Sequence, residues 1–125
     1  MRVLVDSSVW IDHLRRGEPA LVRLLEAGRV VTHPAVIGEL ACGSLRKRES
    51  FLRQIMLLPA LAEGRADEAL HLLEEHRLWG SGLGWVDILL LTSCRISSTR
   101  IWTRDRALRV AAAALAVSHS GTVEE

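Results

Sequence analysis

The chain has 125 residues, of which 49% are hydrophobic and 25% charged, a composition typical of one globular domain over residues 1–125. The formal net charge is only +1, which excludes the strong overall positive field of many nucleic-acid-binding proteins. A charge at position 6 argues against a signal peptide, and no apolar run is long enough to span a membrane, so we expect a cytoplasmic protein. Cys42 and Cys94 are too few and too far apart to predict a disulfide framework or a zinc site.

Short apolar runs alternate with helical patterns along the chain. We predict strands at residues 3–5, 29–32, 99–103 and 115–117. A first helix is predicted after Ser7-Ser8, which can cap it, and others from Pro19, from Pro34, and at residues 51–58, 67–79, 85–94 and 104–114, before a frayed tail at residues 118–125. This alternation predicts an α/β fold, with a parallel sheet of about four to five short strands and helices on both faces. Ligands of such sheets bind beyond the carboxyl ends of the strands.

Four acidic residues have positions that suggest a shared site. Asp6 and Asp105 each follow a predicted strand, so both are expected at the same edge of a parallel sheet. Asp87 lies within the apolar run of residues 85–91, where an unpaired carboxylate is costly, and Glu39 lies within a similar helix. Four converging carboxylates would repel one another without a cation, and an all-oxygen set suits Mg²⁺ or Mn²⁺.

Each acid also has a purely structural interpretation. Asp6 can be a turn residue at the end of a strand, and Glu39 can be a solvated helix residue. Asp87 and Asp105 fall in the first turns of predicted helices, where a carboxylate is favoured by the helix dipole without any further role.

Four segments in this order resemble the successive motifs of PIN-domain nucleases, and most closely those of VapC toxins. The segments are Val3-Leu4-Val5-Asp6-Ser7-Ser8-Val9-Trp10-Ile11, Ala35-Val36-Ile37-Gly38-Glu39-Leu40, Gly84-Trp85-Val86-Asp87-Ile88-Leu89-Leu90 and Trp102-Thr103-Arg104-Asp105. The resemblance covers essentially the whole chain. It implies a PIN-like fold in which the metal-binding and catalytic acids are Asp6, Glu39, Asp87 and Asp105.

The resemblance also implies an activity and partners. The expected protein is a Mg²⁺-dependent endoribonuclease, with Mn²⁺ as an alternative ion, that acts as the toxin of a bacterial pair. Its expected partners are RNA, a VapB-type antitoxin and a second copy in a homodimer, with no membrane. Ser7 and Thr103 match hydroxyl positions that support the carboxylates, and Arg104 and Arg106, which flank Asp105, are candidate RNA contacts.

Two other functions compete with this interpretation. A receiver-like phospho-acceptor domain has a similar size and an acidic pocket at the strand ends. It would need an adjacent acidic pair after the first strand and a lysine after the last, whereas Ser7-Ser8 follow Asp6 and the only lysine is Lys47. A non-catalytic PIN-like binding module is the second alternative, and the sequence alone leaves it open.

Overall fold

The computed structural model describes residues 1–124, which form three strands and seven helices. The strands are β1 (Val3–Val5), β2 (Val30–Val31) and β3 (Arg100–Trp102). The helices are α1 (Ser7–Arg16), α2 (Pro19–Glu26), α3 (Pro34–Ala41), α4 (Arg48–Ile55), α5 (Ala66–Glu75), α6 (Trp85–Ile96) and α7 (Arg106–Ala114). The last residue of the predicted tail, Glu125, lies outside the described residues.

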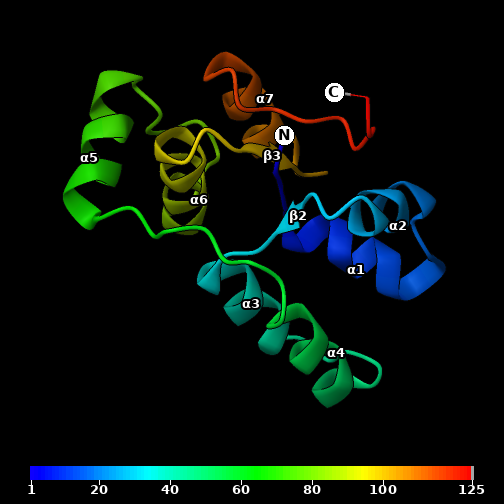
Figure 1. The fold of residues 1–125 in the computed structure, drawn as a ribbon. Helices are drawn as coiled ribbons and strands as arrows, with labels where there is room; N and C mark the ends of the chain where they lie inside the picture. Colours follow the sequence, from blue (N-terminus) through cyan, green and yellow to red (C-terminus); the bar gives the residue numbers. More distant parts are fainter. Residues whose placement is uncertain (125) are drawn as a thin grey trace.

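The three strands form one parallel sheet in the order β2-β1-β3. Leu4, in the central strand, lies opposite Val31 on one side and Ile101 on the other. Figure 1 shows the helices on both sides of the strands, with α1 and α2 on one side and α5 and α6 on the other. The predicted α/β fold with a parallel, helix-covered sheet is therefore confirmed.

The predicted count of four to five strands is wrong, because the outermost segments pair with the sheet at single residues. Thr32 pairs with Ala60 beside β2, and Ile101 pairs with Ser118 beside β3. Residues 115–117 do not form the predicted strand, since Ala116 has a φ of 60° and turns the chain at the end of α7. The backbone still approaches the sheet, and the amide of Ile101 donates to the carbonyl of Val117 at 2.7 Å.

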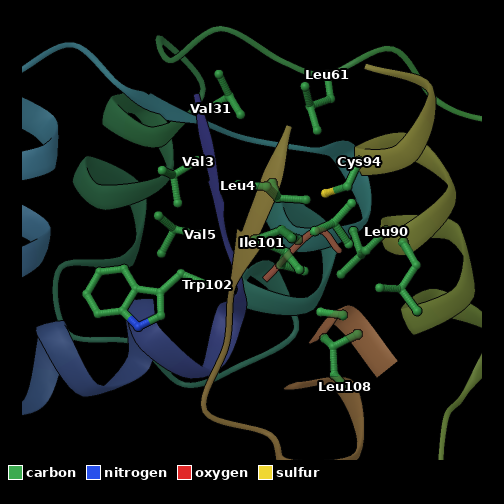
Figure 2. Close-up of a cluster of buried hydrophobic side chains, with 14 of the residues drawn as sticks. Val3, Leu4, Val5, Val31, Leu61, Leu90, Cys94, Ile101, Trp102 and Leu108 are labelled. Atoms are coloured by element: carbon green, nitrogen blue, oxygen red, sulfur yellow. The ribbon is translucent and has the colours of Figure 1, made fainter. Parts of the chain in front are cut away.

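Alternate residues of the strands pack on opposite faces of the sheet. In Figure 2, Val3, Val5 and Trp102 point to one face, whereas Leu4 and Ile101 point to the other. The second face packs against Leu90 and Cys94 of α6 and Leu108 of α7, all of them buried. Burial on both faces explains why the strands are apolar at nearly every position.

Helix ends follow the local chemistry of the chain. Pro19 and Pro34 stand at the start of α2 and α3 as predicted, because proline lacks the amide hydrogen that a first turn leaves unbonded. Helix α5 ends at Glu75, earlier than the predicted 79, and Arg77 follows in the left-handed region with a φ of 51°. Within the described residues, no helix combines the length and apolar character needed to cross a membrane.

The predicted frayed tail is wrong for residues 118–121. His119 and Gly121 are buried, and the amide of Gly121 donates to His119 Nδ1 at 2.9 Å. Gly121 lies directly against the six-membered ring of Trp102. The segment therefore packs against a buried aromatic ring.

Candidate metal centre

The carboxyl edge of the sheet brings the first and last motifs of the chain together. Asp6 follows β1, and Thr103 follows β3, which pairs with β1 up to Val5 and Trp102. The amide of Asp6 donates to the carbonyl of Trp102 at 3.0 Å, so the pairing continues to the residue that carries the carboxylate. Asp6 is only 5% exposed.

Two hydroxyl groups hold the buried carboxylate of Asp6 through one of its oxygens. Ser8 Oγ donates to Asp6 Oδ2 at 2.8 Å, and Thr103 Oγ1 donates to the same oxygen at 2.7 Å. Each hydroxyl also accepts a hydrogen bond from the backbone. The amide of Arg104 donates to Ser8 Oγ at 3.0 Å, and the amide of Asp105 donates to Thr103 Oγ1 at 3.1 Å. Among the described residues no hydrogen bond reaches Asp6 Oδ1, which leaves that oxygen available to a ligand.

Asp87 and Asp105 each cap the start of a helix: Asp87 lies in the first turn of α6, as predicted, whereas Asp105 stands just before α7 and not in its first turn. Asp87 Oδ2 accepts from the amide of Gly84 at 2.9 Å at the start of α6. Asp105 Oδ2 accepts from the amide of Leu108 at 2.9 Å at the start of α7. Capping uses one oxygen of each carboxylate, so this role is compatible with a second one for the other oxygen.

Glu39 reaches the same region from α3. Its Oε1 accepts a long hydrogen bond of 3.4 Å from Ser7 Oγ, at the start of α1. The residue as a whole is exposed, but protein surrounds part of its carboxyl group. All four acids thus have one oxygen bonded to the scaffold and no hydrogen bond to the other oxygen from any residue in the range 1–124.

The charges of neighbouring acids act on Glu39 and on Asp87. Burial raises the pKa of Glu39 above its ordinary value, and the charges of Asp6 and Asp87 raise it further against the opposing hydrogen bond of Ser7. Burial also raises the pKa of Asp87; the hydrogen bond from Gly84 opposes this rise, and the charges of Asp105 and Asp6 add to it. A region in which neighbouring carboxylates raise the pKa values of Glu39 and Asp87 is one where a cation is favourable.

The donor set matches a hard divalent cation in chemistry. Every candidate ligand is a carboxylate oxygen, which is the ligand type of Mg²⁺ and Mn²⁺. In the described range no three His, Cys, Asp or Glu side chains stand close enough to hold an ion together as they are arranged. Binding of one ion by all four acids therefore remains a prediction, and it requires side-chain rotation toward the ion.

Of the two predicted supporting hydroxyls, Thr103 contacts Asp6 and Ser7 contacts Glu39. Sequence reasoning assigned Ser8 only to helix capping and missed its bond to Asp6. The signal was present, because a hydroxyl two residues after an acid can fold back onto it when the acid stands at the start of a helix. The capping role itself is wrong, since Asp6 occupies the position before α1.

The two arginines beside Asp105 differ in their contacts. The Arg104 guanidinium binds Asp12 at 2.6 Å and also Glu18, and it lies 5.6 Å from the centre of the Trp102 ring. Arg106, the first residue of α7, is exposed, and its side chain has no hydrogen bond or ion pair with any residue in the described chain. Of the two candidate RNA contacts, only Arg106 presents an uncommitted guanidinium.

His33, beyond the end of β2, has a structural role. Its Nδ1 accepts from the amide of Ala35 at the start of α3, and its Nε2 lies 3.0 Å from the hydroxyl of Ser93 in α6. Because Nδ1 is an acceptor, the proton of the neutral ring is on Nε2 and is donated to Ser93. Burial lowers the pKa of His33, and the nearby charge of Glu63 only partly opposes this.

Comparison with known proteins places this arrangement in a family. The model of the PIN domain family matches residues 3–114. Ribonuclease VapC32 from two Mycobacterium tuberculosis strains, CDC 1551 and H37Rv, is 45% identical over 112 residues, covering 89% of this chain and 90% of the relative. The crystal structure of PAE2754 from Pyrobaculum aerophilum superposes with a TM-score of 0.61 at 17% identity, covering 98% of this chain and 82% of that chain. The chain therefore belongs to the PIN domain family, as a protein of the VapC type.

Proposed function

We propose that the chain is a metal-dependent endoribonuclease that hydrolyses RNA phosphodiester bonds as the toxin of a bacterial toxin–antitoxin pair. The observation that carries the proposal is the buried Asp6 carboxylate at the carboxyl edge of the sheet, held by Ser8 and Thr103, whose charge also raises the pKa values of Glu39 and Asp87. The relative that shares 45% of its residues with this chain bears the name ribonuclease, which agrees with the proposal. Membership of the PIN domain family is incompatible with a receiver-like phospho-acceptor.

The metal would be Mg²⁺, with Mn²⁺ as an alternative, held by Asp6, Glu39, Asp87 and Asp105. When bound, such an ion acidifies a coordinated water and neutralises charge on the phosphoryl group. The protein contributes a rigid Asp6, whose carboxylate is immobilised by two hydroxyls before any ligand arrives.

RNA would be held by groups that surround the acids. Arg106 has an uncommitted guanidinium next to Asp105 and suits a phosphate contact. Trp79 and Trp85 are 56% and 45% exposed and flank the glycine-rich segment before Asp87, so both are candidates to stack on unpaired bases.

Two protein partners follow from the toxin role. A VapB-type antitoxin would silence the enzyme, with an antitoxin Arg or Lys that enters the acidic region and competes with the metal. A homodimer is the expected assembly of the toxin, and the cytoplasm is the expected location. Co-expression with the antitoxin encoded beside this chain should give a complex without ribonuclease activity. An antitoxin that neither binds nor silences the chain would count against this role.

The central experiment compares RNA cleavage by the wild-type protein and two asparagine variants, with Mg²⁺ and with a chelator. Asp6→Asn retains a carbonyl that can accept from Ser8 and Thr103 but removes the buried charge. Asp67→Asn is the matched control, because Asp67 is an exposed acid in the first turn of α5, paired with Arg65. We expect Asp67→Asn to cleave like the wild type and Asp6→Asn to be inactive. Binding of RNA without Mg²⁺-dependent cleavage by the wild type would favour the non-catalytic PIN-like module instead.

A further inference from the structure

Arg104 connects the turn that carries Asp105 to two other elements. Its guanidinium donates to Asp12 Oδ2 in α1 at 2.6 Å and to the carboxylate of Glu18, which immediately precedes α2. The same guanidinium lies 5.6 Å from the centre of the Trp102 ring, and the side chain is only 32% exposed. We call the contacts of Arg104 with Asp12, Glu18 and Trp102 the Arg104 clamp.

The backbone of Arg104 is fixed as well. Its amide donates to Ser8 Oγ at 3.0 Å, and Ser8 holds Asp6. The neighbouring amide of Asp105 donates to Thr103 Oγ1, and Thr103 also holds Asp6. The turn between β3 and α7 is therefore attached to α1 at its first turn through Ser8 and further along through Asp12.

We propose that Arg104 is a positioning residue that holds Asp105 in place opposite Asp6, and that it does not contact RNA itself. This inference rests on the proposed function, in which Asp105 is one of four metal-binding acids. Two carboxylates already bind the guanidinium group, and its central carbon lies over the ring of Trp102. A phosphate would have to displace both carboxylates, whereas Arg106 is free to bind one.

The clamp affects geometry more than overall stability. Pairs of partly exposed charges contribute little to the free energy of unfolding. Asp12 and Glu18 bind the side chain of Arg104 and Ser8 binds its backbone amide, so the clamp limits movement of the segment that carries Asp105. Small displacements of a ligand-bearing segment have large effects on catalysis even when the fold is intact.

The test uses two ways of opening the clamp. Arg104→Gln removes the guanidinium, and the double variant Asp12→Asn with Glu18→Gln removes both carboxylates but keeps Arg104 and frees it. Arg16→Gln is the matched control, because Arg16 also pairs with Asp12, at 3.4 Å, but does not touch the turn. The measurements are amide hydrogen exchange over residues 103–108, Mn²⁺ affinity of the protein without RNA, and the kcat and KM of RNA cleavage.

We expect both clamp variants to exchange the amides of Asp105 and Leu108 faster and to bind Mn²⁺ more weakly. Both should lose about 10- to 100-fold in kcat with KM changed by less than about twofold. Arg16→Gln should match the wild type in every measurement. A variant Arg104→Gln that raises KM alone, beside a double variant that cleaves normally, would identify Arg104 as an RNA contact and overturn the proposal.

Hydrogen exchange separates this inference from the proposed function. Unchanged exchange over residues 103–108 in both clamp variants shows that the clamp does not hold the turn, whatever the activity. A second outcome is faster exchange in both clamp variants, together with a wild-type protein that neither binds Mn²⁺ nor cleaves RNA. That outcome supports the clamp and rejects the ribonuclease proposal.

Discussion

Thr103 donates a hydrogen bond of 2.7 Å to Asp6, across 97 positions of the sequence. The bond joins the ends of β1 and β3, and it reaches a carboxylate that is only 5% exposed. A buried carboxylate is costly unless donors compensate its charge, and Thr103 and Ser8 are the side chains that do so. The parallel pairing of two strands thus places a donor beside a buried acid.

The first prediction concerns Thr103→Val, which preserves the shape of the side chain but removes the hydroxyl. Asp6 would lose a donor and the amide of Asp105 an acceptor, so the free energy of unfolding should fall by about 1.5–3 kcal/mol. Thr99→Val is the control, because Thr99 is also buried but donates only to a backbone carbonyl, that of Ser97, at 3.2 Å. Urea denaturation should show the larger loss for Thr103→Val, and only this variant should lose RNA cleavage. Equal losses of stability in the two variants would contradict the role of Thr103 as a partner of a buried charge.

The second prediction is a loss of stability in mild acid that depends on His33. Burial lowers the pKa of this ring below its ordinary value of 6.5, so the unfolded chain takes up a proton at a higher pH than the folded chain. Its contribution is therefore complete above pH 6.5 and is lost as the pH falls below that value toward the lowered pKa. His33→Asn keeps an acceptor for the amide of Ala35 but cannot titrate, so its unfolding free energy should change less between pH 7 and pH 5. His71→Asn, at an exposed position beside Glu75, should behave as the wild type does.

Sequence reasoning succeeded where one local pattern had one structural solution. Val3 to Asp6 could be predicted because a short apolar run that ends at an acid fits a buried parallel strand. Pro34 marked the start of a helix because proline is tolerated there. The meeting of Asp6 with the turn that follows β3 could be inferred from topology, since parallel strands end at the same edge, whereas a shared site for all four acids stays a prediction.

The remaining features depend on tertiary contacts that have no local signature. The segment 115–117 has strand composition, but the left-handed Ala116 redirects it, and only Ser118 pairs with β3. Arg104 looked like a phosphate contact because Asp12 and Glu18 lie 92 and 86 positions away in sequence. The contacts of Arg104 with Asp12 and Glu18 cannot be inferred without knowing how α1 and α2 pack beside β3.

The third prediction tests the buried C-terminal segment through Gly121→Ala. A Cβ at this position would stand 2.6 Å from Trp102 Cε2 and Cζ2, and the residue has a φ of +91°. Gly80→Ala is the control for the backbone cost alone, because Gly80 has a φ of +70° and its Cβ would meet no atom within 4 Å. Both variants bear a backbone cost of about 1–2 kcal/mol, and Gly121→Ala should lose about 1–3 kcal/mol more from the steric clash. Similar unfolding free energies for the two variants would show that residues 118–121 leave the Trp102 ring easily.

The last prediction concerns Asp87→Asn, which keeps the size of the side chain and removes one charge from the acidic region. The pKa of Asp87 is raised in the folded protein above its ordinary value of 3.8, so at neutral pH its charged form is less favourable there than in the unfolded chain. Without metal, Asp87→Asn should therefore melt at a higher temperature than the wild type at pH 7. This advantage should shrink as the pH falls through the raised pKa, because the wild type then gains the proton that relieves the repulsion. The cap survives, since an asparagine carbonyl can accept from the amide of Gly84.

Metal and activity should respond in the opposite direction. Mg²⁺ should raise the melting temperature of the wild type more than that of Asp87→Asn, because the variant has lost a ligand and a compensating charge. The rate of RNA cleavage should fall by about 100-fold or more. Asp67→Asn serves as the control, because its pKa is lowered mainly by the hydrogen bond from Arg65, so at pH 7 its removal should lower the melting temperature slightly and leave cleavage unchanged. If Asp87→Asn cleaves RNA at the wild-type rate, and Mg²⁺ raises its melting temperature as much as that of the wild type, then Asp87 is only a helix cap. The four-carboxylate site is then wrong.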